Sequence, residues 1–283
     1  MFVGKLRNFI VKYMNLKNFA KRLRIETLRM THLGKSSHIG SILSIVDIVA
    51  VLYGKILKIN PTSIKKKNRN RFILSKGHAG AAVYAALSHL GFFSPKKLST
   101  HCQNNSTLSG HISHINNPGI ELSTGSLGHG LSVACGFAFA GKLKKEKSKV
   151  YALLSDGECN EGLTWEAAMF AGFHKLNNLI TIIDYNKLQS LTSTTKTLDL
   201  EPFRDKWESF GWKCLEMNGN DIMILEKNLT RISKSKQKKP ICIIAHTTKG
   251  CGVSFMENKV LWHYRSPNEK ELELALKEVN NER

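Results

Sequence analysis

The chain has 283 residues and a formal net charge of +20, with 42 lysines and arginines against 22 acidic residues. Its length suits one large domain or two small ones, and its apolar share of 42% predicts a sizeable core. No apolar run approaches the length of a membrane span, and the six cysteines form no C-x-x-C pair. The sequence therefore speaks against a membrane protein, a zinc site and a disulfide framework, and we expect a soluble, cytoplasmic protein.

The positive charge raises the question of nucleic-acid binding. Lysines cluster within residues 65–67, 142–149 and 234–239, each cluster lying between apolar segments. Aromatic residues, which stack on bases in many nucleic-acid-binding surfaces, are not interleaved with these lysines. We expect solvated loops that at most attract phosphorylated substrates weakly, and a basic nucleic-acid-binding or regulatory module is the non-enzymatic alternative.

The amino-terminal residues 1–14 are basic, and their apolar stretch is too short and interrupted for a signal peptide. An amphipathic helix is predicted to follow, opening at Met14 to Leu16. The residues on its apolar face are Leu16, Phe19, Leu23 and Thr27. We interpret residues 1–14 as an extension to a domain that spans 15–283, with Met14 as the candidate native start; a targeting peptide is the alternative.

Three of the next segments carry a histidine close to glycines. His38 lies in a loop before an apolar helical run that ends at about residue 52. His78 follows a short strand and precedes an Ala-rich helix, so it lies at a helix start, where anions are favoured. His111 lies in a polar stretch, residues 102–120, whose spacing matches no zinc pattern. Taken alone, each histidine could equally be a surface or capping group.

A Gly-rich loop, residues 123–130, leads into a helix of small residues that runs to about residue 140. Its glycines could bring the backbone close to a ligand, or could serve only close helix packing.

The central stretch reads as strand, turn, helix, strand and turn. Short apolar runs at residues 150–154 and 179–183 predict buried parallel strands, and they end in turns that contain Asp156 and Asn186. In a right-handed βαβ unit these two side chains emerge at the same sheet edge. Their oxygens, with a backbone carbonyl such as that of Leu188, would suit Mg²⁺ or Ca²⁺ that also binds phosphate. An ordinary capped turn is the alternative.

Further strands and helices alternate to the end of the chain, with another buried strand at residues 241–245 and a polar final helix at 268–279. This alternation predicts a three-layer α/β/α fold with a mostly parallel sheet. Ligands of such folds bind at the carboxyl ends of the strands.

The central stretch resembles the thiamine diphosphate motif, usually Gly-Asp-Gly followed later by Asn. Ser155 stands where the first glycine is usual, but Asp156 and Gly157 are kept. Together with the histidine segments, residues from about 15 to 267 resemble transketolase, more closely the amino-terminal subunit of two-chain transketolases. The resemblance implies the thiamine diphosphate-binding fold, in its diphosphate-binding (PP) domain form.

The resemblance also implies roles for particular residues. The metal ligands would be Asp156, Asn186 and the carbonyl of Leu188. The residues against thiamine diphosphate would be His78, Gly125, Leu127, Gly157, Asn186 and His263. The catalytic residues, which bind substrate and move protons, would be His38, His111 and His263, whereas His101 and His114 have no counterpart.

Two features around these residues leave alternatives open. Glu158, Glu161 and Glu166 are predicted to lie in a first helical turn, where acids stabilise a helix without any chemistry. Glu161 also matches a family position at which a buried glutamate links paired active sites across a subunit interface. After His263 the family usually has glycine, and Tyr264 here puts the backbone path, and so the aim of His263, in question.

The implied activity is transfer of a two-carbon ketol unit from a ketose phosphate to an aldose phosphate, as in the pentose phosphate pathway, with thiamine diphosphate and Mg²⁺ or Ca²⁺. Family enzymes need a second, pyrimidine-binding domain, so we expect a heterotetramer with a carboxy-terminal partner subunit. The alternatives are a split thiamine-dependent enzyme acting on an unusual sugar in surface-polysaccharide synthesis, an α component of a 2-oxoacid dehydrogenase, and a relative that makes deoxyxylulose phosphate.

Overall fold

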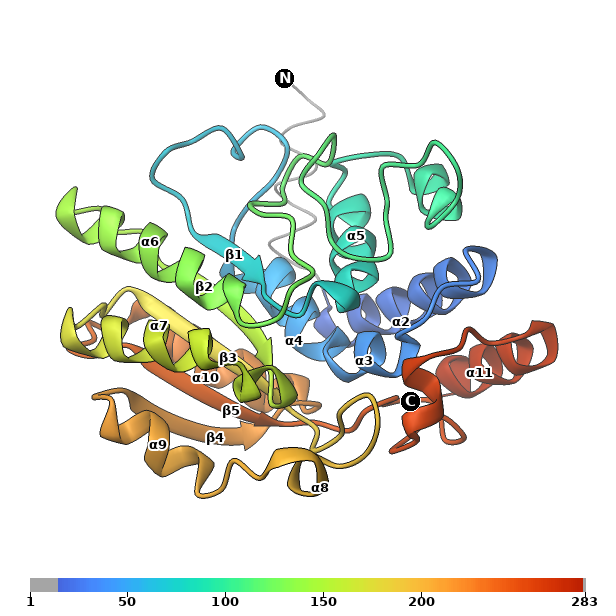
Figure 1. The fold of residues 1–283 in the computed structure, drawn as a ribbon. Coiled ribbons are helices and arrows are strands. Elements are labelled where there is room, and N and C mark those ends of the chain that lie inside the picture. The colour runs from blue at the N-terminus through green and yellow to red at the C-terminus, as the bar shows by residue number, and fades with distance from the viewer. Residues whose placement is uncertain (1–14, 282–283) are drawn as a thin grey trace.

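A five-stranded sheet organises the chain (Figure 1). The structure is a computed structural model that describes residues 15–281, so the predicted extension over 1–14 and the candidate start at Met14 lie outside the described residues. The strands lie in the order β1-β2-β3-β5-β4, and every neighbouring pair is parallel. They are β1 (Arg71–Leu74), β2 (Val150–Ser155), β3 (Leu179–Tyr185), β4 (Lys213–Asn218) and β5 (Ile241–His246). The predicted fold class is confirmed.

Helices cover both faces of the sheet (Figure 1). One face carries α2 (Leu16–Leu33), α3 (Ile39–Ser44), α4 (Val46–Val51), α5 (Gly80–His89) and α10 (Ile222–Lys234), with α11 (Glu269–Asn281) against α2. The other face carries α6 (His129–Leu143), α7 (Gly162–Phe173) and α9 (Phe203–Ser209). A short helix, α8 (Thr194–Leu198), follows the turn after β3. None of the described helices is long and apolar enough to cross a membrane.

The strands feed two hydrophobic cores because successive side chains point to opposite faces. Tyr151 and Leu153 of β2 belong to the core under α2 to α5, whereas Ala152 and Leu154 belong to the core under α6 and α7. Both faces of β2 are therefore buried, which explains its unbroken apolar run.

Helix α2 confirms the predicted amphipathic segment, since all four residues of its predicted apolar face are buried. Asn15 caps its start by accepting a hydrogen bond from the Asn18 amide at 3.0 Å. The buried Arg24 guanidinium pairs with the Asp47 carboxylate of α4 at 2.6 Å. This ion pair fixes α2 against α4.

The apolar run that follows His38 is not one continuous helix. Helix α3 ends at Ser44, α4 begins at Val46, and Ile45 between them has non-helical dihedrals (φ −106°, ψ 1°). A π-helical turn, Leu52–Ile56, closes the segment. The break has a consequence for the interior, because it lets the Ser44 hydroxyl reach a buried carboxylate of β3 at 2.5 Å.

The lysine clusters occupy the loops that lead into β1, β2 and β5, at the amino-terminal edge of the sheet. Most of their side chains are exposed, including Lys65, Lys66 and Lys67, as expected for solvated loops. These three lysine clusters therefore lie at the opposite edge of the sheet from the carboxyl ends of the strands.

Candidate active site

A cavity of about 250 Å³ opens at the carboxyl ends of β1, β2 and β3. All of the predicted site residues line it: His38, His78, His111, Gly125, Leu127, Asp156, Gly157, Asn186, Leu188 and His263. A larger hollow of about 640 Å³, beside the start of α10, contains none of them. The fold thus brings together segments from distant parts of the chain, as the carboxyl-edge rule for parallel sheets predicts.

Asp156 lies directly after β2 and is only 1% exposed. Its carboxylate accepts hydrogen bonds from the backbone amides of Gly157 at 2.7 Å and Lys187 at 2.5 Å. Burial, together with the neighbouring Asp184, raises the pKa of Asp156 to about 7. Among the ion pairs of residues 15–281 none involves this carboxylate. A buried carboxylate without a cationic partner is suited to bind a metal ion.

Asn186 and Leu188 present two further oxygens to the same cavity. The Asn186 amide nitrogen donates to the Asp184 carboxylate at 2.9 Å, so its Oδ1 points the other way, where it accepts from the Leu188 amide at 3.0 Å. The Leu188 carbonyl accepts a hydrogen bond from the Lys249 ammonium at 3.2 Å. Carboxylate, amide and carbonyl oxygens form the donor set that Mg²⁺ and Ca²⁺ prefer.

Four histidine rings line the cavity around His38. The centroid of the His38 ring lies 4.8 Å from that of His263 and 5.0 Å from that of His78. The His111 ring lies 5.7 Å from the His38 ring. Burial lowers the pKa of His38 to about 4 and that of His263 to about 3, and holds the pKa of His78 well below 6.5. These three rings are therefore neutral at pH 7, and each can donate one hydrogen bond and accept another.

The hydrogen bonds of His263 determine its tautomer. Lys249 is buried, and its ammonium lies 3.1 Å from His263 Nδ1. Burial lowers the pKa of Lys249 to about 8, so most of it stays protonated at pH 7. An ammonium group cannot accept, so His263 Nδ1 accepts and Nε2 carries the proton. Tyr264 has an ordinary φ of −109°, so the position usually held by glycine imposes no backbone strain here.

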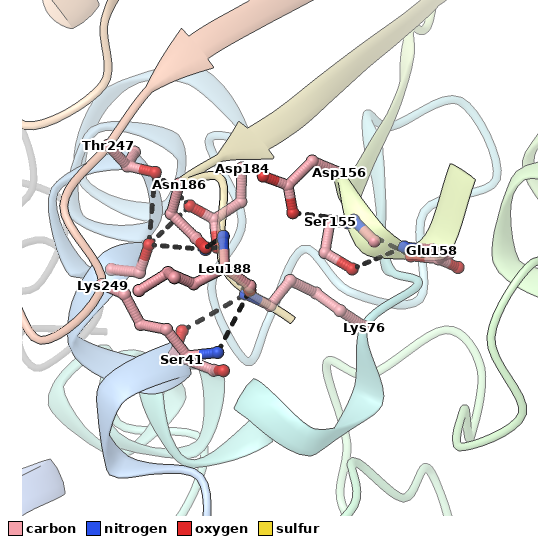
Figure 2. A network of polar contacts seen from close by, with 12 residues as sticks. Ser41, Lys76, Ser155, Asp156, Glu158, Asp184, Asn186, Leu188, Thr247 and Lys249 are labelled. Carbon is pink, nitrogen blue, oxygen red and sulfur yellow. Dashed lines mark hydrogen bonds and ion pairs between the residues drawn. The ribbon is translucent and has the colours of Figure 1, made fainter. Parts of the chain in front are cut away.

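A buried ion pair joins Lys76 and Asp184, neither of which was predicted from the sequence. Lys76 Nζ lies 2.5 Å from the Asp184 carboxylate, and both side chains are at most 1% exposed (Figure 2). Burial alone would raise the pKa of Asp184, but the Lys76 charge and hydrogen bonds from Lys76, Ser44 and Thr247 hold it below its usual value. The only local feature of the sequence that could have indicated a role for Lys76 is its position two residues before His78.

Glu158 lies in the first turn of a helix, as predicted, but this is the short 3-10 helix Gly157–Asn160 that precedes α7. Its side chain is fully buried. Its carboxylate accepts from the Gly128 amide at 2.8 Å and from the Ser75 hydroxyl, so it ties the Gly-rich loop to the end of β1. The Ser155 hydroxyl in turn accepts from the Glu158 amide at 3.2 Å, so serine adds a contact where the motif usually has glycine.

The remaining predictions concern residues around the cavity. Gly128 has φ +83°, and a Cβ there would lie 2.8 Å from that of Glu161, which explains a glycine at the start of α6. Glu161 is exposed and stands at the N-cap of α7, where an acid is favourable, although its side chain makes no capping hydrogen bond. Glu166 lies beyond the first turn of α7. His101 is buried outside the cavity, where its Nδ1 lies 3.1 Å from the Leu108 carbonyl. His114 also lies outside the cavity lining.

The neutral histidines predict a pH dependence of stability. An unfolded histidine titrates near pH 6.5, whereas folded His38 titrates near pH 4, so between these values the unfolded chain binds more protons. The free energy of unfolding should therefore fall as the pH drops from 7 to 5. The variant His38→Asn should lose less of its free energy of unfolding over this pH range. The difference from the wild type should be below ~1.4 kcal/mol per pH unit, the value for one group that is protonated only in the unfolded chain, because the His38 ring is partly exposed.

Urea unfolding at pH 7 and pH 5 measures this difference. Asparagine suits the backbone of position 38, whose φ is +77°, so the variant should fold. Equal losses in the wild type and in His38→Asn would contradict the assignment of a neutral His38.

Comparisons with known proteins identify the family of this chain. Residues 16–279 match the family described as transketolase, thiamine diphosphate binding domain. An apulose-4-phosphate transketolase subunit of Phocaeicola vulgatus is 41% identical, over 95% of this chain and 95% of its own length. The 6-deoxy-6-sulfo-D-fructose transketolase subunit SqwG of Clostridium is 37% identical over 94% of this chain and 95% of its own length.

Longer relatives match over less than half of their length. Human transketolase is 34% identical over 95% of this chain but only 42% of its own length. The structure of transketolase from Campylobacter jejuni superposes with a TM-score of 0.87 at 32% identity, covering 94% of this chain and 43% of that one. The chain therefore belongs to the transketolase family and corresponds to its amino-terminal, thiamine diphosphate-binding domain.

Proposed function

We propose that this chain is the diphosphate-binding subunit of a two-chain transketolase, which transfers a two-carbon ketol unit from a ketose phosphate to an aldose phosphate. The observation that carries the proposal is the meeting of one buried carboxylate, two further oxygen donors and four histidines in a single cavity. Relatives of the same length are named as transketolase subunits, which supports a divided enzyme.

The cation site would be built from Asp156, Asn186 and the Leu188 carbonyl. They fit Mg²⁺ or Ca²⁺ because all three supply oxygen donors and because the Asp156 carboxylate takes part in no ion pair of the described chain. A divalent ion there would hold the cofactor's diphosphate at the end of β2. Gly157 would allow the close approach because it has no Cβ, and a larger residue would not fit there, since a Cβ would lie 2.8 Å from the Gln189 side chain.

The other cofactor contacts would come from both sides of the cavity. His78 and His263 would donate hydrogen bonds to diphosphate oxygens, and the proton on His263 Nε2 is placed for this by Lys249. The backbone groups of Gly125 and Leu127 would hold the aminopyrimidine, in a loop fixed by the buried Glu158. Thiamine diphosphate, when bound, supplies the carbanion chemistry of ketol transfer.

The histidines would serve the sugar. The His38 ring is neutral at pH 7, so it can accept a hydrogen bond from a substrate hydroxyl and exchange a proton with it. His263, whose Nδ1 faces the Lys249 ammonium, would act in catalysis as a hydrogen-bond donor from Nε2. His111 lies at the exposed side of the cluster, where it would bind the hydroxyl or carbonyl of the incoming sugar. The described chain is poor in arginines near the cavity, so the sugar phosphate would be held by the partner.

Two apolar surfaces support contacts with other subunits. Beside the cavity, Leu191, Leu261 and Tyr264 are each more than half exposed, and they would face a carboxy-terminal, pyrimidine-binding subunit. Helices α6 and α7 also carry exposed apolar side chains, Leu143 on α6 and Met169, Phe170 and Phe173 on α7. Two copies of this chain would pack through these helices to give a heterotetramer, in an interface that would also include Glu161 at the N-terminal end of α7.

Two-chain relatives are named for apulose 4-phosphate and for 6-deoxy-6-sulfo-D-fructose, which favours an unusual sugar as a second candidate beside the phosphorylated sugars of the pentose phosphate pathway. Assays of the assembled enzyme should therefore compare several ketose donors and aldose acceptors.

The cation site predicts the effect of Asp156→Ala. Removing the only carboxylate of the donor set should abolish Mg²⁺-dependent binding of thiamine diphosphate, measured by calorimetry on the complex with the partner subunit. Asp205→Ala, at an exposed position of α9, is the matched control and should leave the affinity unchanged. Unchanged affinity in Asp156→Ala would refute the cation site.

The substrate role of His111 predicts a different pattern. His111→Ala should lower kcat by about 10²-fold or more, the order expected for loss of a proton-transfer group, with cofactor affinity changed less than about threefold. His114→Ala, three positions away and outside the cavity lining, should retain the wild-type values. Equal losses of kcat and cofactor affinity in His111→Ala would reassign this histidine to cofactor binding.

A further inference from the structure

Asp184 is a fully buried carboxylate at the carboxyl end of β3, and it does not line the cavity. We propose that Asp184 is a positioning residue, whose carboxylate orients the Asn186 amide so that Asn186 Oδ1 faces the cation site. This inference rests on the proposed cation site of Asp156, Asn186 and Leu188, and it concerns how one of those ligands is held.

The contacts of Asp184 divide between its two oxygens (Figure 2). Oδ1 accepts from the hydroxyls of Ser44, at 2.5 Å, and Thr247. Oδ2 accepts from the Lys76 ammonium at 2.5 Å and from the Asn186 amide at 2.9 Å. Donors from the end of α3, the end of β1 and the loop after β5 thus fix the carboxylate, and Asn186 is the fourth.

A fixed carboxylate determines which way the Asn186 amide turns. An ionised carboxylate only accepts, so it selects the NH₂ end of the amide. The Ser44 hydroxyl, 3.4 Å from the same nitrogen, lies on that side as well. The reversed amide would place its oxygen against the Asp184 carboxylate in a buried site, and would lose the bond from Oδ1 to the Leu188 amide. The surrounding groups therefore fix the orientation of the Asn186 amide, with its nitrogen toward Asp184 and its oxygen toward the cavity.

The role of Asp184 in this arrangement is geometric. Lys76 balances the charge of Asp184 at 2.5 Å, so the pair contributes little net charge to a cation on the far side of Asn186. What Asp184 provides is a hydrogen-bond acceptor at one fixed point. Partners of this kind, which hold a ligand without touching the metal, commonly change metal affinity by about 10- to 100-fold when removed.

The test distinguishes the effect of Asp184 as a hydrogen-bond acceptor from the effect of its negative charge. Lys76→Met gives a background without the buried cation, and Asp184→Asn and Asp184→Leu are added to it. Both double variants lack the charge pair, but asparagine keeps an oxygen that can accept from Asn186, whereas leucine has none. Replacing both members of a buried ion pair avoids leaving one charge unpaired. The readout is the dissociation constant of Mn²⁺ at saturating thiamine diphosphate, from the electron paramagnetic resonance signal of free Mn²⁺, on the complex with the partner subunit.

The expected result is that Lys76→Met/Asp184→Leu binds Mn²⁺ at least about tenfold more weakly than Lys76→Met/Asp184→Asn, which has the same charge but keeps the acceptor. Equal affinities in the asparagine and leucine variants would overturn the positioning role. Absence of Mn²⁺ binding by the wild-type complex would instead overturn the proposed cation site.

A second pair of variants applies if the leucine variant does not fold. Asn186→Asp alone would place two carboxylates 2.9 Å apart, so one of them must take up a proton or turn away. The exchange Asp184→Asn/Asn186→Asp restores a donor and an acceptor in reversed order, and should bind Mn²⁺ at least about tenfold more tightly than Asn186→Asp. Equal affinity of these two variants would also contradict the inference.

Discussion

The buried ion pair of Lys76 and Asp184 is the interaction on which the site depends. Placing either charge alone in the protein interior would be strongly unfavourable. The pair is stable because the two charges lie 2.5 Å apart and because two hydroxyls and an amide donate the remaining hydrogen bonds to the carboxylate. The pair also joins the ends of β1 and β3, which are not neighbours in the sheet. The ends of these strands thereby hold His78 on one side of the cavity and Asn186 on the other.

Burial gives the same cavity two kinds of chemistry. It keeps the rings of His38, His78 and His263 neutral, so they can both donate and accept hydrogen bonds at pH 7. It also raises the pKa of Asp156, whose ionised carboxylate would be stabilised by a bound cation. A divalent ion and a diphosphate would satisfy both conditions together, since the ion compensates the carboxylate and the diphosphate accepts from the histidines.

Much of the site could be predicted from the sequence because parallel strands end at one edge of a sheet. This rule alone brings Asp156 close to Asn186, and the resemblance added the histidines, which the fold indeed gathers around the same cavity. The buried charges could not be predicted, because each depends on a distant partner: Lys76 pairs with a residue 108 positions away, and Glu158 with Ser75. The break at Ile45 could not be predicted either, because the apolar periodicity of this segment predicts helix through it.

The central claim is that this chain holds one half of a cofactor site that a partner subunit completes. Calorimetric titration with thiamine diphosphate and Mg²⁺, first of the chain alone and then of its mixture with a carboxy-terminal transketolase subunit, tests the claim most directly. The account predicts Mg²⁺-dependent binding that appears, or becomes at least about tenfold tighter, only in the mixture. Absence of binding in both titrations, or equal affinity with and without the partner, would contradict it.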